Sequence, residues 1–277
     1  MRHWTSLAGV DIVVIMQLST RSAIARSTQA YCSLISEAES LDYGVAFRCQ
    51  RFRRLTAANQ IREVVADSAE SAAESFESVE AYYASHGLEC HRWAPTIDAD
   101  PEVLNACLTP HGFTARSLNA MVLADWPTLN ENSHIRILPA RPMRDAFGRT
   151  YVDASLAGLD DPNQVADAAL DRLDEAALDM FVAVVDKKPV GRGGLFMVGD
   201  IGRIVDVAVL PEWRGQGVGT SVMRHLLALA QRLVPRIVCL EVDAGDEASG
   251  ALLTRCGFVA DGQLVEFDRS TANPKAP

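Results

Sequence analysis

The chain has 277 residues, of which 48% are hydrophobic, and carries a formal net charge of −10 at pH 7. This length allows two modest domains or one large one, and the apolar share supports ordinary hydrophobic cores. The acidic balance argues against a nucleic-acid partner, which needs a basic face. The six cysteines are scattered, with no C-x-x-C pair, which predicts free thiols in a reducing cytoplasm and no metal site.

The N-terminal stretch contains an apolar run from Leu7 to Leu18. Arg2 before it and small residues after it loosely resemble a secretory signal, but Asp11 interrupts the run, which is too short to span a bilayer. A flexible extension, or a true start at Met16, is the alternative. We expect a poorly ordered extension over residues 1–30 and a cytoplasmic protein without a membrane partner.

Apolar residues recur at helical spacing from Ile61 to Tyr83, which predicts a helix ending near Gly87. Acidic residues from Glu63 to Glu80 occupy its other face and are interpreted as a solvated surface. A nearby basic cluster, Arg48 to Arg54, is either a binding patch or, as we favour, an exposed strand or a partner for those acids.

An internal repeat links the two halves of the chain. Residues 97–115 and 242–260 align at an offset of 145 with nine identical positions, including the pairs Gly112/Gly257 and Phe113/Phe258. Each copy follows an extended segment, contains a short helix and turns through Gly-Phe into another extended segment. Self-similarity at this distance indicates two halves of like design, although chance and shared secondary structure also contribute.

The second half follows a polar, proline-bearing linker over residues 127–132. Periodicity predicts helices between residues 143 and 179. It also predicts strands at 134–138, 180–185, 189–198, 201–209, 236–242 and around 263–267, and helices at 217–233 and 246–255.

The most informative stretch is the junction between the strand ending at Val209 and the helix beginning at Gly217. Pro211 ends the strand because it has no N–H to donate, and Arg214, Gly217 and Gly219 form R-x-x-G-x-G. A glycine turn that opens a helix aims free N–H groups and a positive dipole at one point, which suits a phosphate. A Walker loop is a poor match because no lysine precedes Thr220, and the dinucleotide pattern G-x-G-x-x-G is not met.

This junction closely resembles motif A of the GCN5-related N-acetyltransferases (GNAT), in which a V-x-V-x-P strand end precedes [QR]-x-x-G-x-[GA]. The resemblance implies an α/β mixed-sheet fold, the acyl-CoA N-acyltransferase (GNAT) fold, in two tandem copies, with acetyl-CoA as cosubstrate and no metal. Pantetheine would pair with the main chain of Val207, Ala208 and Val209. The residues implied to hold the pyrophosphate are Arg214, Gly215, Gln216, Gly217, Val218, Gly219 and Thr220.

Only the second repeat follows an R-x-x-G-x-G, so residues 31–126 are interpreted as a degenerate GNAT-like domain that binds no cofactor. Residues 133–270 would form the catalytic N-acetyltransferase domain and residues 271–277 a tail. By this arrangement the protein would be a monomer with pseudo-dimeric halves, or a homodimer.

Asp206 is the titratable residue beside the expected thioester and is the candidate catalytic residue. It could be a general base, an anion facing the acceptor, or a group that orients a neighbour. His225 is expected to lie on the surface. The family often carries a tyrosine that protonates the departing thiolate, and here Leu253 stands at that position, with Asp246 at a frequent asparagine and Cys256 expected in the core.

The predicted function is acetyl transfer from acetyl-CoA to a primary amine of a small molecule or peptide by direct attack in a ternary complex. Two alternatives remain, namely an acyl-CoA sensor or pseudoenzyme and a tandem enzyme resembling mycothiol synthase. Acids between Asp160 and Asp179 are either a solvated face or a negative lip for a cationic acceptor.

Overall fold

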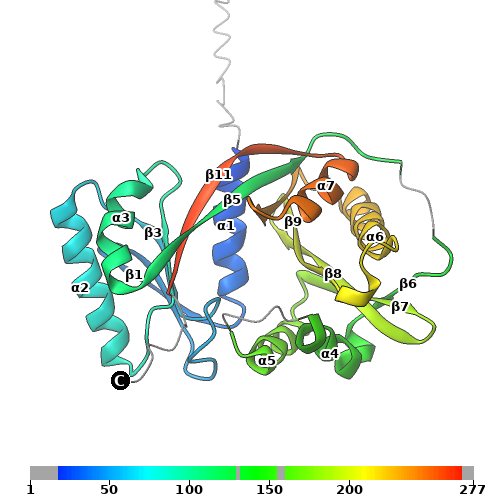
Figure 1. Cartoon of the computed structure of the whole chain (residues 1–277), viewed down its shortest axis with the longest axis horizontal. Coiled ribbons are helices and arrows are strands. Elements are labelled where there is room, and N and C mark those ends of the chain that lie inside the picture. Colours follow the sequence, from blue (N-terminus) through cyan, green and yellow to red (C-terminus); the bar gives the residue numbers. More distant parts are fainter. Residues whose placement is uncertain (1–17, 129–131, 155–159, 270–277) are drawn as a thin grey trace, which may run out of the picture.

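The strands of both halves join one continuous sheet in the computed structural model, which describes residues 18–128, 132–154 and 160–269 (Figure 1). This sheet has 11 strands in the order β1-β2-β3-β4-β11-β5-β10-β9-β8-β7-β6. Helices cover both faces, and α1 runs across the middle, where the two halves meet.

The first half begins with the helix α1 (Thr20–Cys32), which packs on the central strands. Its remaining helices are α2 (Ala69–Ser85) and α3 (Pro101–Leu108). Its strands are β1 (Glu37–Leu41), β2 (Gly44–Arg48), β3 (Gln60–Val64), β4 (Arg92–Pro95) and β5 (Phe113–Leu123).

The second half carries four helices, α4 (Arg144–Ala154), α5 (Pro162–Arg172), α6 (Val218–Leu233) and α7 (Glu247–Arg255). Its strands are β6 (Arg136–Pro139), β7 (Leu178–Val185), β8 (Lys188–Val198), β9 (Ile201–Val209), β10 (Ile237–Asp243) and β11 (Phe258–Arg269). Short 3-10 turns occur at Thr109–His111, Arg141–Met143 and Pro211–Trp213.

The closing strands of the two repeats are exchanged between the halves. β5, from the first half, lies between β10 and β11 of the second half, and β11 lies between β4 and β5 of the first. The two closing strands pair antiparallel along their length, from Phe113 opposite Arg269 to Leu123 opposite Phe258. Each half therefore completes its sheet with a strand supplied by the other.

The repeat seen in the sequence has the expected local structure in both copies. Gly112 and Gly257 adopt left-handed φ values of 83° and 84° and turn α3 and α7 into β5 and β11. An added Cβ at Gly257 would lie 2.1 Å from the carbonyl oxygen of Asp125, so this turn requires glycine. The Gly-Phe signature is confirmed as a helix-to-strand turn.

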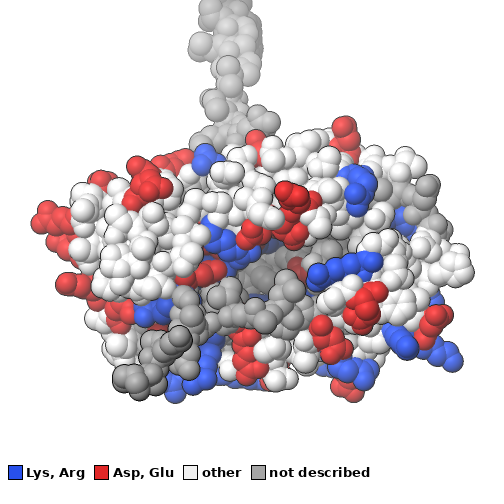
Figure 2. Space-filling view, in the orientation of Figure 1, with Lys and Arg blue, Asp and Glu red and all other residues white. Residues whose placement is uncertain are grey.

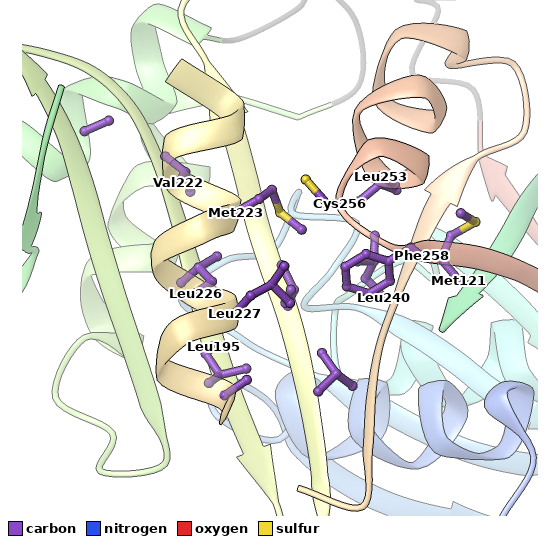
Figure 3. Packing of buried hydrophobic residues seen from close by; sticks show 14 of the residues in the cluster. Met121, Leu195, Val222, Met223, Leu226, Leu227, Leu240, Leu253, Cys256 and Phe258 are labelled. Atoms are coloured by element: carbon purple, nitrogen blue, oxygen red, sulfur yellow. The ribbon is translucent and has the colours of Figure 1, made fainter. Parts of the chain in front are cut away.

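The core of the second half shows how far the halves interpenetrate (Figure 3). Val222, Leu226 and Leu227 on α6 are buried against the sheet, and Leu253 on α7 closes the same cluster. Met121 on β5 belongs to this cluster although it comes from the first half. The apolar core of the second half is thus incomplete without the first.

Three expectations about element boundaries were wrong. Ile61 and Val64 belong to β3, so the predicted helix begins only after Ser68, whose side chain accepts the N–H of Ser71 and caps α2. Residues 20–30, assigned to a poorly ordered extension, form most of α1, whose Ala23 and Ile24 are buried. The last strand is longer than expected because β11 pairs with β5 along its length and also with β4 at its end.

The other strands and helices predicted for the second half are present within a few residues of their expected ends. Residues 1–17, part of the linker (129–131) and the tail lie outside the described residues. Within the described ranges, no helix is both long and apolar enough to cross a membrane, and the cysteines are free thiols.

Candidate active site

The loop between β9 and α6 leaves a row of backbone donors open. Gly217 is the residue before α6, has a left-handed φ of 82° and provides no side-chain cap. No acceptor in the described part of the chain meets the N–H groups of residues 215–220. A cluster of unsatisfied donors at the positive end of a helix is a site for an anion.

Other contacts fix the shape of this loop. Arg214 donates from Nε to the carbonyl oxygen of Val209 at 3.2 Å, and Gln216 donates to that of Glu212 at 2.9 Å. An added Cβ at Gly219 would lie 3.0 Å from Leu252 on α7, so this glycine lets two helices approach closely. Arg214, Gly217 and Gly219, the three fixed residues of R-x-x-G-x-G, thus have distinct roles in this loop.

A slot opens beside the loop because β9 and β10 part. Their parallel pairing covers only Ile201 to Arg203 of β9, opposite residues 237–239. Beyond Arg203, the β10-facing edge of β9, which includes Val207, Ala208 and Val209, has no partner strand among the described residues. An extended ligand can therefore pair with the free edge.

Asp206 occupies a bulge in β9 at the mouth of this slot. Two residues of β9, Asp206 and Val207, oppose the single residue Gly193 of β8 here, since Val205 pairs with Gly194 and Ala208 with Arg192. Asp206 has a φ of 53°, which is unusual for a residue other than glycine. The bulge turns its side chain toward the face covered by α1 and α4, where it meets two tyrosines.

The two tyrosines hold one oxygen of the Asp206 carboxylate. Tyr31 on α1 and Tyr151 on α4 donate their hydroxyls to Oδ2 at 2.6 Å and 2.9 Å. The other oxygen, Oδ1, accepts no hydrogen bond from the described residues. Asp206 is half-buried, so the carboxylate is held firmly on one side and open on the other.

The surroundings keep both phenols protonated. Burial raises the pKa of Tyr31 well above its usual value of 10, and the negative charge of Asp206 raises it further. Burial and Asp206 raise the pKa of Tyr151 in the same way. Arg172 stacks on the ring of Tyr31 at 4.4 Å and Arg192 on that of Tyr151 at 3.6 Å, which fixes both rings and adds positive charge.

The sequence reasoning missed both tyrosines. Tyr151 lies in a helix whose position was expected, but nothing in its spacing marks it as a partner of Asp206. Tyr31 is the first residue assigned to the degenerate half, next to the expected extension, and it lies 175 residues away from Asp206. A long-range contact of this kind leaves no local signal.

The residues that depart from the usual pattern of the family, together with His225, have structural roles in the core or at a helix end. Leu253 is 5% exposed and Cys256 is fully buried, so Cys256 is in the core as expected and Leu253 leaves no hydroxyl there. Asp246 caps α7 by accepting the N–H of Ser249. His225 is half-buried against Phe181 rather than on the surface, and burial lowers its pKa.

Ion pairs neutralise part of the group of acids between Asp160 and Asp179, the candidate negative lip. Asp171, Asp174 and Asp179 pair with Arg51, Arg144 and Arg141. Asp160 and Asp161 accept backbone N–H groups. Asp167 and Glu175 remain exposed, so the feature that suggested a strongly cationic acceptor is weak.

The basic cluster is also paired, though not with the acids of α2. Arg48 contacts Glu37 at 2.7 Å, and Arg51 contacts Asp171 at 2.5 Å. Of the acids on α2, Glu80 pairs with Arg269, while Glu70, Glu74 and Glu77 are exposed as expected. In Figure 2 carboxylates gather at the α2 end of the molecule, whereas basic side chains border the hollow between the halves.

Two observations define the fold class of this chain. Its mixed sheet opens between two parallel strands next to an uncapped glycine loop and helix, and solved structures that share this fold include GCN5-related N-acetyltransferases. A GCN5-related N-acetyltransferase from Kribbella flavida is 15% identical with a TM-score of 0.65, covering 93% of this chain and 97% of that one.

Other solved structures extend the likeness. A functionally unknown conserved protein from Staphylococcus epidermidis is 17% identical with a TM-score of 0.64, covering 85% of this chain and 94% of that one. A GCN5-related N-acetyltransferase from Sphaerobacter thermophilus is 18% identical with a TM-score of 0.55, covering 73% and 67%. No curated protein sequence matches the chain.

The family follows from the sequence itself. Residues 142–258 match the acetyltransferase (GNAT) family, a range that runs from α4 to the start of β11 and includes the slot and the loop. This part of the chain therefore matches an acetyltransferase (GNAT) domain, which supports an acyltransferase.

Proposed function

We propose that residues 133–270 transfer an acetyl group from acetyl-CoA to a primary amine of a small molecule or peptide, by direct attack in a ternary complex. The observation that carries the proposal is the continuity of the open β9 edge with the uncapped start of α6. One presents backbone groups to an extended arm, and the other presents N–H groups to a pyrophosphate.

The residues divide the binding of acetyl-CoA between them. Val207, Ala208 and Val209 would pair with the pantetheine arm through main-chain groups, and residues 214–220 would bind the pyrophosphate. A main-chain N–H on the β9 edge would also face the thioester oxygen, where negative charge develops during attack. When bound, acetyl-CoA supplies an acyl thioester whose thiolate can leave.

Asp206 is proposed to act on the acceptor amine. Its free Oδ1 can accept a proton from the acceptor ammonium before attack, or from the amine nitrogen as the C–N bond forms, while Tyr31 and Tyr151 hold Oδ2 and fix the carboxylate. The new C–N bond forms as the C–S bond breaks, and the amine proton passes to Asp206 or to water. An anion that only orients the acceptor would use the same geometry.

The thiolate has no protein acid in the usual place. Leu253 is buried in the core and carries no hydroxyl. The thiolate of coenzyme A would therefore leave unprotonated or take a proton from water. This feature is also the observation that favours the second candidate function, an acyl-CoA sensor with little turnover.

Thiol release from acetyl-CoA, measured over a panel of small amines and peptide amines, separates the two functions. An acetyltransferase releases thiol in proportion to the acceptor and forms the acetylated amine. A sensor would bind acetyl-CoA in a calorimetric titration, but none of the amines would raise thiol release above the rate of background hydrolysis. That result would overturn the enzymatic proposal.

A further inference from the structure

A cavity of about 710 Å³ lies in the first half, away from the slot between β9 and β10. It is bordered by one face of α1, by the ends of β3 and β4, by the turn into α3 and by the middle of β11. Small-molecule sites in proteins commonly have volumes of about 300–1,000 Å³. This cavity is large enough for a metabolite.

The cavity lies beside a carboxylate that corresponds to Asp206. Glu63 on β3 sits in a bulge where two residues oppose one of β4, and it has a φ of 55°. Non-glycine residues in this conformation persist where the surroundings hold them, and they cluster at ligand sites. α1 contacts both carboxylates, since Gln29 donates to Glu63 at 2.5 Å and Tyr31 donates to Asp206.

Acetyl-CoA does not fit this position. The pairing of β3 with β4 continues past the bulge, from Val64 opposite Pro95 to the N–H of Thr96, which donates to Val64. Ser68 caps the helix that follows, so the helix start offers fewer free donors. A ligand here must therefore use side chains rather than an open strand edge and a phosphate loop.

Charges of both signs line the cavity, and two of them, Glu63 and Arg26, form no ion pair among the described residues. Glu63 is exposed, and only its Oε1 accepts a hydrogen bond, from Gln29. Arg26 is exposed and has no ion pair among the described residues, although it lines the same cavity. Arg62 and Glu266 form a buried ion pair at 2.9 Å, so that part of the lining is neutral.

The order of these groups along α1 sets the shape of the ligand. Gln29 lies at the Glu63 end, Arg26 lies one turn before it, and Arg21 lies more than one further turn away. Arg21 contacts Asp98 at a distance of 3.8 Å, which is weak, and donates to the carbonyl oxygen of Ile97. With a rise of about 1.5 Å per residue, this face of the helix extends about 12 Å.

We propose that this cavity is a second ligand site, which binds an extended zwitterion such as an ω-amino carboxylate. The ammonium group lies against Glu63 and Gln29, and the carboxylate lies against Arg26, with Arg21 beyond it. The methylene chain between them contacts the apolar part of the lining, which includes Ala25, Pro95 and Leu264. Both charges of the ligand are matched by groups, Glu63 and Arg26, that form no ion pair among the described residues.

The test is isothermal titration of the full chain with 5-aminopentanoate, with pentylamine and pentanoate as probes that each carry one of its two charges. We expect 5-aminopentanoate to bind at least about 10-fold more tightly than either single-charge probe. Glu63→Gln and Arg26→Gln should each weaken its binding by about 10-fold or more, because each removes one charge–charge contact. Acetyl-CoA affinity should be unchanged in both variants.

Arg54→Gln is the matched control, since Arg54 is also an exposed arginine of the first half but does not line this cavity. It should bind 5-aminopentanoate as the wild type does. Absence of binding by the wild type at about 10 mM would overturn the proposal. So would equal binding of all three probes, unchanged binding in both variants, or displacement of 5-aminopentanoate by acetyl-CoA.

Discussion

The two halves of this chain use the same sequence of strand, helix and closing strand, yet only the second half has a free strand edge beside an uncapped helix start. In the second half β9 leaves β10 after Arg203, and eight residues separate Val209 from the start of α6 at Val218. In the first half β3 stays paired with β4, and α2 starts at Ala69 after a loop of four residues, 65–68. The shorter loop has no room for a phosphate cradle.

The start of each helix shows the same contrast. Ser68 and Ser71 form a reciprocal capping box at α2, so side chains satisfy donors that would otherwise be free. Gly217 leaves the corresponding donors of α6 exposed. A capped helix is more stable by about 1 kcal/mol and binds no anion, whereas an uncapped glycine start gives up that stability and can bind a pyrophosphate.

The largest effect is expected when the halves are separated. A protein beginning at Ser133 lacks β5, which leaves the facing edges of β10 and β11 unpaired and removes Met121 from the core. We expect loss of soluble folded protein, measured by soluble yield and circular dichroism. Coexpression of residues 18–128 as a separate chain should restore it. A soluble, active second half alone would show that the exchange is dispensable.

Asp206→Asn tests the carboxylate at the bulge of the second half. If Asp206 is the general base, kcat should fall about 1,000-fold and the decline in rate toward acid pH should disappear. If it only orients the acceptor, the acceptor KM should rise instead. Asp186→Asn is the matched control, because Asp186 is an exposed aspartate with a φ of 48° in the β7–β8 turn. Wild-type kinetics in Asp206→Asn would make the residue structural.

Gly217→Asp tests the difference between the two helix starts. It places a negative charge where the pyrophosphate is proposed to bind, and the affinity for coenzyme A should fall about 100-fold with the fold preserved. Ser68→Asp is the matched control, because it places the same side chain at the start of α2 and should leave the affinity for coenzyme A unchanged. We also expect the wild type to saturate at one coenzyme A per chain. Unchanged affinity in folded Gly217→Asp, or two equivalents bound, would contradict the contrast drawn between the halves.

Glu266→Gln tests the ion pairs by which β11 contacts β3 and β4 of the first half. Burial by itself would raise the pKa of Glu266, but the charges of Arg92 and Arg62 lower it from 4.5 to about 2. This carboxylate therefore stabilises the fold above pH 4.5, and that contribution, about 3 kcal/mol, is lost as the pH falls toward 2. The free energy of unfolding, measured with denaturant between pH 2 and 4.5, should depend less steeply on pH in the variant than in the wild type. An equal pH dependence in both proteins would exclude this role.

The smallest effect is expected for Tyr31→Phe. It removes one of two hydroxyls from Asp206, so the free energy of unfolding should fall by about 1 kcal/mol and kcat by a few-fold. Because burial and Asp206 raise the pKa of Tyr31, the phenol stays protonated at neutral pH, and the effect should not vary between pH 6 and 9. A pH-dependent loss would instead indicate that the phenol itself exchanges the proton.

The sequence by itself determined the elements whose signals are local. Pro211, Gly217 and the apolar residues of α6 fix a strand, a turn and a helix through backbone restrictions and 3.6-residue periodicity. The paired Gly-Phe turns revealed the repeat for the same reason. These features predicted the fold class, the loop and the position of Asp206.

Only the tertiary structure decided which strands become neighbours and what surrounds Asp206. The exchange of β5 and β11 pairs residues up to 156 positions apart, such as Phe113 and Arg269, and either strand would satisfy the same alternating pattern within its own half. Tyr31 reaches Asp206 because α1 packs across the joint. Contacts at such separations depend on how whole faces pack, and a local pattern of residues does not contain that information.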